Sequence, residues 1–377
     1  MRNKIAIILS SVMAVSLLGG CTGTPVVYNN SCECNYVAGE YTQVLEEIRD
    51  AIKSGAIQVA APQETQTADS ADVAVKTGLS VMVNLADSTN ADAENAGAAK
   101  YDITVAAVSV DDNGVIDACR IDSIPATINF DAAGVITTDL AAEILTKDEL
   151  GEGYGMKLYG GAKYEWNEQA AALAEYAVGK TLDELKNGAV GETGMAVDAD
   201  LASTATIYLG GYVAAIEEAV NQAQHLGAKK GDELRLASIS GMGSSKSADA
   251  ENAGVAQLDS DFAVLTLDGD MITSCYLDSV QAKVNFDAKG AITTDLAADV
   301  LTKNELGENY GMKLYAGAAY EWNEQAAAFA AYATGKTAAE VTGIAVNEKT
   351  APTDADLAST VTIAVAGLQA VIEKAAK

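Results

Sequence analysis

Two short hydroxyl-rich segments carry the clearest chemical pattern in the chain. Asp198-Ala-Asp-Leu-Ala-Ser203-Thr204 returns as Asp354-Ala-Asp-Leu-Ala-Ser359-Thr360. We expect each segment just before the last helix of its repeat, where hydroxyls and free backbone N–H groups meet. Such a helix start favours an anion such as phosphate. The alternative interpretation is that these residues only cap the helix.

A second set of repeated residues has side chains suited to a ring-bearing ligand. The aromatic members could stack on a planar ring, and the lysines could face a phosphate; these residues are Tyr154, Trp166, Lys157 and their counterparts Tyr310, Trp322, Lys313. Packing in the core and on the surface is the alternative for them. The neighbouring carboxylate pairs, Glu165 with Glu168 and Glu321 with Glu324, are predicted to form a solvated helix face rather than an acid/base pair.

The hydroxyl-rich segments resemble the acceptor motif of the FMN-binding domain family of exported bacterial proteins. In that family an Asp, two spacer residues and Ser-Gly-Ala-Thr precede a C-terminal helix, and FMN is joined through its phosphate to the Thr hydroxyl. The resemblance implies that Asp198 and Asp354 are the leading Asp and that Thr204 and Thr360 are the acceptors. The chain departs from the pattern where Leu-Ala-Ser replaces Ser-Gly-Ala. The Tyr-Gly-Met-Lys and Glu-Trp-x-Glu-Gln stretches instead resemble a group of small clostridial-type lipoproteins.

The resemblance implies a flavin carrier for electron transfer with a redox partner protein, without catalytic activity of its own. The alternative is a non-enzymatic surface lipoprotein that binds a small molecule or a protein through a repeated pocket. The single histidine, His225, is expected in the linker, so a repeated Ser-His-Asp site is excluded. No metal site is predicted. A net charge of −29 repels nucleic acid and argues against it as a partner.

The N-terminus has the layout of a bacterial lipoprotein signal. Arg2 and Lys4 precede an apolar run from Ile5 to Leu18, which is too short to span a bilayer. Leu18-Gly19-Gly20-Cys21 resembles the lipobox, which implies cleavage of residues 1–20 and lipidation of Cys21. The predicted product is extracytoplasmic and lipid-anchored to the cell membrane. An ordinary cleaved signal with an incidental cysteine is the alternative.

The other cysteines are sparse. Cys32 and Cys34 lie too close to each other for an easy bridge, which leaves intermolecular pairing or metal capture open. Cys119 and Cys275 occupy equivalent positions in the two repeats and alternate with apolar neighbours. We expect both to be small buried core residues.

A long internal repeat organises the rest of the chain. Residues 129–140 return as 285–296, and residues 154–159 return as 310–315. A repeat of this length indicates two tandem domains rather than a solenoid. The expected layout is an anchor, short amphipathic helix and spacer over 21–74, domains over 75–222 and 235–377, and a linker over 223–234.

Within each repeat, strands precede helices. Residues 101–110 and 115–122 alternate around an Asn-Gly turn, which predicts a hairpin, and 124–130 resembles a third strand. Helical spacing then begins at Trp166, and Thr181-Leu-Asp-Glu184 fits a capping box. A final helix carries Val213 and Ile216. This order predicts an α+β fold, in two copies of an antiparallel sheet with helices packed on it.

Overall fold

The computed structural model of the chain describes residues 73–377. The predicted signal peptide, Cys21, Cys32, Cys34, the amphipathic helix and the spacer lie outside the described residues.

Each repeat contains one three-stranded antiparallel sheet, so the predicted α+β fold in two copies is confirmed. The strands lie in sequence order in each sheet, with the middle strand paired to both neighbours. They are β1 (Lys76–Asn84), β2 (Gly97–Val110) and β3 (Ile116–Phe130), then β4 (Glu233–Gly241), β5 (Gly254–Asp268) and β6 (Met271–Phe286).

The predicted hairpin is confirmed, but the strand count around it differs from the expectation. Asp111 Oδ1 accepts the backbone N–H groups of Asn113 and Val115, which closes the turn. β3 (Ile116–Phe130) then runs unbroken through Ser123, where residues 115–122 and 124–130 were predicted to be two separate strands. The Ser123 hydroxyl is buried and donates to Asp102 Oδ1 on β2, which explains a polar residue in mid-strand. β1 was not predicted.

The helices follow the strands in both repeats and are short. In the first repeat they are α2 (Lys147–Leu150), η2 (Gly151–Tyr154), α3 (Met156–Gly160), α4 (Trp166–Ala177), α5 (Leu182–Ala189), α6 (Ala199–Thr204) and α7 (Gly210–Asn221). In the second they are α8 (Lys303–Leu306), η3 (Gly307–Tyr310), α9 (Met312–Ala316), α10 (Trp322–Ala333), α11 (Ala338–Thr342), α12 (Ala355–Ala358) and α13 (Ala366–Ala375). Over residues 73–377, no helix combines the length and the apolar composition needed to cross a membrane.

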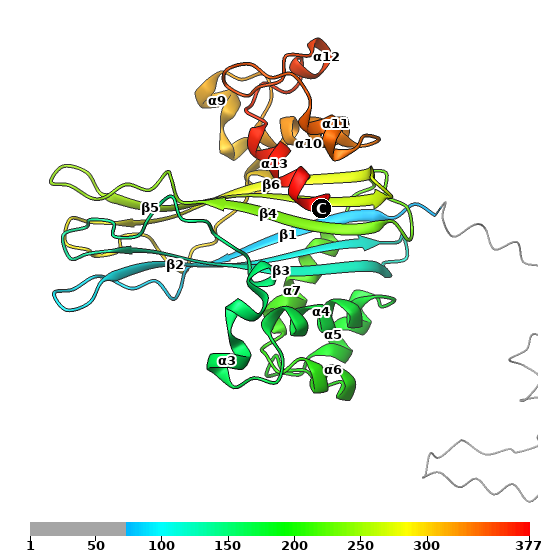
Figure 1. Cartoon of the computed structure of the whole chain (residues 1–377), viewed down its shortest axis with the longest axis horizontal. Helices are drawn as coiled ribbons and strands as arrows, with labels where there is room; N and C mark the ends of the chain where they lie inside the picture. Colours follow the sequence, from blue (N-terminus) through cyan, green and yellow to red (C-terminus); the bar gives the residue numbers. More distant parts are fainter. Residues whose placement is uncertain (1–72) are drawn as a thin grey trace, which may run out of the picture. The chain divides into compact units, whose positions relative to one another are not determined.

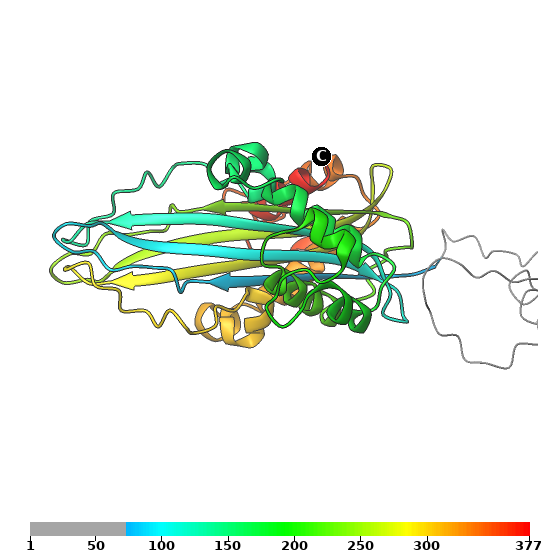
Figure 2. The same ribbon diagram turned by 90° about the horizontal axis from the view of Figure 1, so that it is seen from below.

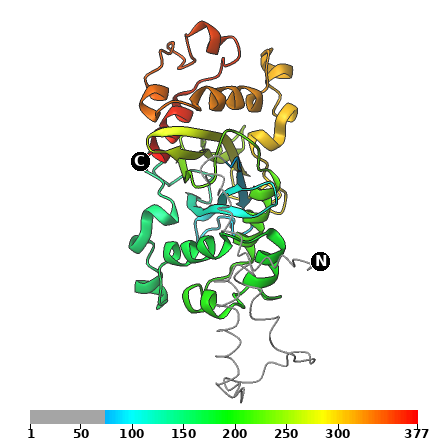
Figure 3. The same cartoon turned by 90° about the vertical axis from the view of Figure 1, so that its right-hand side faces the viewer.

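The two sheets pack face to face, and each carries its helices on the opposite face (Figure 1). The central core therefore draws buried residues from both repeats, including Tyr101, Ile128, Leu258 and Val284. Two further cores lie between each sheet and its own helices. Figure 3 shows the same layers from the end of the strands.

The far ends of the long strands, which extend beyond the helices in Figure 2, also hold the repeats together. The Phe130 and Phe286 rings stack with centroids 4.0 Å apart. Ala91 donates its N–H to the Gly290 carbonyl and Ala248 donates to the Gly134 carbonyl, both at 2.8 Å. A Cβ on Gly134 would lie only 2.7 Å from the Ala248 Cβ, so this close approach requires glycine.

Candidate functional site

The hydroxyl-rich segments form short helices of their own rather than the start of the last helix. Asp198 caps α6, accepting the N–H groups of Asp200 and Leu201. The Ser203 hydroxyl donates to the Asp200 carbonyl at 2.7 Å, and the Thr204 hydroxyl donates to the Leu201 carbonyl at 3.1 Å. These groups therefore complete the backbone hydrogen bonding of α6, and α7 begins only at Gly210.

The second repeat has the same arrangement. Asp354 caps α12, and the hydroxyls of Ser359 and Thr360 donate to the carbonyls of Asp356 and Leu357. Ser359 is exposed and Thr360 is partly exposed. The cavities described below do not include Thr204 or Thr360 in their linings.

A buried glutamine, which the sequence analysis missed, fixes the segment that follows α6. Gln169 Oε1 accepts the N–H and the hydroxyl of Thr206 and the N–H of Ile207, at 2.7 to 3.1 Å. Its amide nitrogen donates to the Tyr164 carbonyl. Gln325 makes the same contacts in the second repeat. The repeated Glu-Trp-Asn-Glu-Gln motif could have indicated this buried glutamine, because a glutamine on the apolar side of a helix needs hydrogen-bond partners.

The predicted ligand lysines on α3 and α9 are engaged in ion pairs. Lys157 Nζ lies 2.6 Å from Glu168 Oε2, and Lys313 lies equally close to Glu324. The expectation of a solvated pair is wrong for Glu165, which is only 3% exposed. Its carboxylate accepts the N–H groups of Met156 and Lys157 and so caps α3. Glu321 does the same for α9.

Tyr154 and Trp166 do meet, in a cleft of the first repeat that we call the Lys147 cleft. Its volume is about 590 Å³, and its walls come from β1, β2, α2, η2, α3, α4 and α7. The lining residues are Met82, Val83, Asn84, Asp102, Thr104, Lys147, Tyr154, Met156, Trp166, Ile207, Tyr208, Gly211 and Tyr212. A polar extension of about 310 Å³ shares Asn84, Asp102, Lys147 and Tyr154 with it.

Lys147 is the cation of this cleft. Its Nζ lies 3.1 Å from Asp102 Oδ1 and 5.5 Å from the ring centroids of both Tyr154 and Trp166. The Trp166 indole N–H donates to the Tyr212 hydroxyl at 2.9 Å. Burial alone would lower the pKa of Lys147, but its surroundings, with Tyr212 and Asp102 foremost, raise that pKa above the ordinary value. The lysine is therefore charged at neutral pH.

The second repeat keeps the lysine and the rings but changes their surroundings. Lys303 lies 5.3 Å from the Tyr310 ring and 4.8 Å from the Trp322 ring. The positions of Thr104, Tyr208 and Tyr212 are taken by Asp261, Ala364 and Leu368. Lys147 and Lys303 were not identified from the sequence; in the structure each directly follows the Thr that caps α2 or α8.

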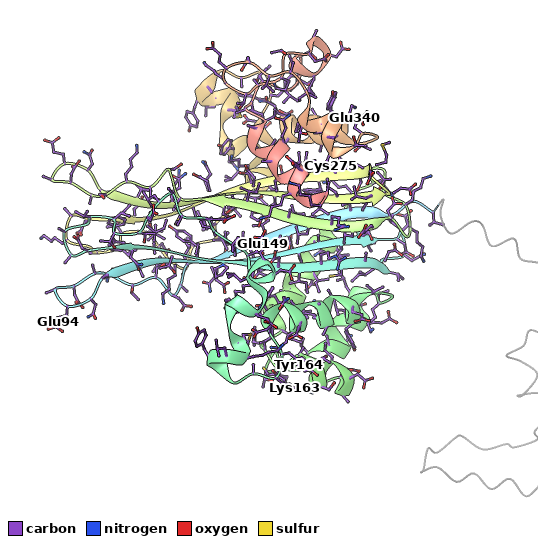
Figure 4. The ribbon with its side chains drawn as sticks, in the orientation of Figure 1. Glu94, Glu149, Lys163, Tyr164, Cys275 and Glu340 are labelled. Atoms are coloured by element: carbon purple, nitrogen blue, oxygen red, sulfur yellow. The ribbon has the colours of Figure 1, made fainter. Side chains whose placement is uncertain are left out.

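A second pair of cavities lies beside the two core cysteines. They have volumes of about 520 and 640 Å³ and are lined by Cys119 and Cys275, respectively. Figure 4 labels Cys275 between the second sheet and its helices. Both cysteines are buried, as predicted, and burial raises the pKa of the Cys119 thiol to about 12. We therefore expect both thiols to be poor nucleophiles at neutral pH.

Comparison of the chain with protein-family models, with curated proteins and with solved structures finds no match in any of the three.

Proposed function

We propose that this protein is a non-enzymatic binding protein that holds a planar aromatic ligand in the Lys147 cleft, and that FMN is such a ligand. The observation that carries the proposal is the meeting of a buried cation with Tyr154 and Trp166 in one cleft. Ligand sites in proteins are concave, of about 300–1,000 Å³, with aromatic walls and a few polar groups.

The lining supports a ring-bearing ligand in particular. Met82, Met156 and Ile207 supply apolar surface beside the aromatic side chains, and Asn84 and Asp102 supply hydrogen-bonding groups toward the polar extension. In this proposal Lys147 replaces Lys157 as the cation, because Lys147 lines the cleft and Lys157 does not. A bound flavin would supply the redox chemistry, and the protein would hold it for electron transfer to a partner protein.

The cellular setting is part of the proposal. Lipidation of Cys21 would tether the binding domains to the outer side of the cell membrane. In the native host, Cys21→Ser is expected to release the protein into the soluble fraction, as followed by fractionation and immunoblotting. A substituted protein that remains with the membrane would contradict the anchor.

Tryptophan fluorescence can test binding repeat by repeat, because the chain has two tryptophans, one in each repeat. Trp322→Phe leaves Trp166 as the reporter, and Trp166→Phe leaves Trp322. FMN titration is expected to quench Trp166. Lys147→Met should weaken binding about tenfold, the size of one charge-assisted contact. Lys157→Met is the matched control and should change the affinity less than twofold. The proposal fails if 1 mM FMN leaves Trp166 emission unchanged.

Covalent attachment at Thr204 and Thr360 stays a separate prediction from the family resemblance. Protein purified from its native exporting host should then give a fluorescent band on a denaturing gel, and Thr204→Ala with Thr360→Ala should abolish it. If the band is dark, the two threonines only complete their helices. Each alanine substitution should then cost no more than about 1 kcal/mol of stability.

A further inference from the structure

The two repeats differ in one place that bears on ligand binding, where the last helix of each repeat passes over the sheet. Gly211 lines the Lys147 cleft, and a Cβ built on it would have the Tyr208 ring as its nearest neighbour, at 4.0 Å. Gly367 is its counterpart, and a Cβ there would overlap Oδ2 of Asp261. The space that is open in the first repeat is filled by a carboxylate in the second.

Asp261 is held in this position by its own repeat. Asp261 on β5 lies opposite Ile239 on β4, as Thr104 on β2 lies opposite Met82 on β1. Asp261 and Thr104 therefore occupy equivalent positions in the two sheets. Ser279 donates a hydrogen bond to it, and it interacts electrostatically with Lys303. The Asp261 carboxylate therefore adds negative charge near Lys303 without forming a direct ion pair with it.

The lysines consequently have different carboxylate surroundings. Asp102 forms a direct ion pair with Lys147 at 3.1 Å. Asp261, Asp259 and Asp278 act on Lys303 at longer range, and among the described residues none of the three forms an ion pair with it. The first repeat has the neutral Thr104 where the second has Asp261. It also has two tyrosines, Tyr208 and Tyr212, where the second has Ala364 and Leu368.

We infer that, of the two repeats, only the first holds this ligand site, and that the ligand places an anionic group, carboxylate or phosphate, beside Lys147 in the space that Asp261 fills in the second repeat. The inference rests on the proposed function and adds the ligand's charge and the stoichiometry. A buried cation attracts an anion strongly because little water screens the pair.

Two matched pairs of probes test the charge of the ligand. FMN and riboflavin share a ring system and differ by the phosphate; indole-3-acetate and indole-3-acetamide differ by the carboxylate. In each pair the anionic compound is expected to bind at least tenfold more tightly than the neutral one. Calorimetry should give one bound molecule per chain. The pair that contains the tighter-binding anion shows whether the site prefers phosphate or carboxylate. Equal affinities within both pairs, or two molecules per chain, would overturn the inference while leaving the proposed function in place. If no probe binds, the proposed function falls, and the inference falls with it.

Exchanging the key residue between repeats tests the site itself. Thr104→Asp copies the second repeat into the first and is expected to weaken FMN binding at least thirtyfold. Thr137→Asp, which adds the same charge at an exposed position outside the cleft, should stay within about threefold of the parent. The fold already accommodates an aspartate at the position equivalent to Thr104 in the second repeat, and circular dichroism checks that both variants are folded. Undiminished binding by Thr104→Asp would contradict the inference.

Discussion

At the scale of single residues, one carboxylate in each repeat, Asp122 (half-buried) or Asp278 (buried), connects the sheet to the helix that follows it. Asp278 is 4% exposed and accepts the N–H groups of Ser279 and Asn304, at 2.7 and 3.1 Å. Asp122 makes the equivalent contacts with Ser123 and Asp148. Burial raises the pKa of Asp278 to about 7 and that of Asp122 to about 6, and the hydrogen bonds offset only part of that rise.

These raised pKa values predict how stability changes with pH. Between about pH 4 and 7 the folded chain binds more protons at these sites than the unfolded chain, so their contribution to stability is fully present at pH 4 and is lost as the pH rises to 7. Asp278→Asn should reduce that loss by about 2–4 kcal/mol. Urea unfolding at pH 4.5 and pH 8 measures it, with the exposed Asp87→Asn as control. A variant with the parent's pH dependence would contradict the assignment.

The buried thiols yield a second residue-scale prediction. Burial raises the pKa of Cys119 and of Cys275, so neither should form thiolate at pH 8. Iodoacetamide should leave both unmodified in the folded protein and should alkylate both in 6 M guanidinium, as read by mass spectrometry of the peptides. Rapid alkylation under native conditions would show that the adjoining cavities open.

At the scale of elements, Gln169 and Gln325 join α4 and α10 to the segments that enter the last helices. Each oxygen accepts three hydrogen bonds from the Thr-Ile step after α6 or α12. Since Ile207 lines the Lys147 cleft, the glutamine in the first repeat also positions a wall of the proposed site.

Removing this side chain should be costly. Gln169→Leu is expected to lose about 3 kcal/mol, because it removes three hydrogen bonds made by one fully buried side chain. Gln325→Leu should cost a similar amount, and Gln222→Leu, which removes a single contact with Glu218, should cost less than 1 kcal/mol. Thermal unfolding of the three variants provides the measurement. Equal losses for Gln169→Leu and Gln222→Leu would contradict this role.

The sequence predicted those elements that depend on local contacts and missed the contacts that form only when the chain folds. Local patterns predicted the hairpin around Asp111, the helix from Trp166 and the box at Thr181, because each depends on contacts within a few residues. The burial of Glu165 and the meeting of Lys147 with Trp166 depend on contacts made by the folded chain, which a single sequence does not reveal. Tyr154 and Trp166 line one cavity, but their stacking on a ligand stays a prediction, and the cation of that cavity was missed.

At the scale of the whole molecule, the shared core makes the two repeats interdependent. Its buried residues come from both sheets, and an ion pair of 2.5 Å joins Glu149 on α2 to Lys374 on α13. Figure 4 labels Glu149 on the first of these helices. Neither sheet could expose this face to water without losing a large apolar contribution to stability.

We therefore expect the repeats to unfold together. In the Trp322→Phe and Trp166→Phe variants, each remaining tryptophan reports on its own repeat, and their urea transitions should coincide. Ile128→Ala, in the core of the first sheet, should shift both transitions by about 2–4 kcal/mol. A shift confined to the Trp166 signal would mean that the repeats unfold independently.

Ala91 in the first half donates to Gly290 in the second, and Ala248 in the second donates to Gly134 in the first. The two halves therefore make equivalent contacts with each other, as the subunits of a symmetric dimer do. Joining such partners in one polypeptide removes a restriction that a homodimer cannot escape, namely that every substitution appears in both subunits at once. In a single polypeptide one repeat can keep an open cavity while the other fills the equivalent space and contributes only to the shared core. The difference between Thr104 in the first repeat and Asp261 in the second is a substitution of this kind.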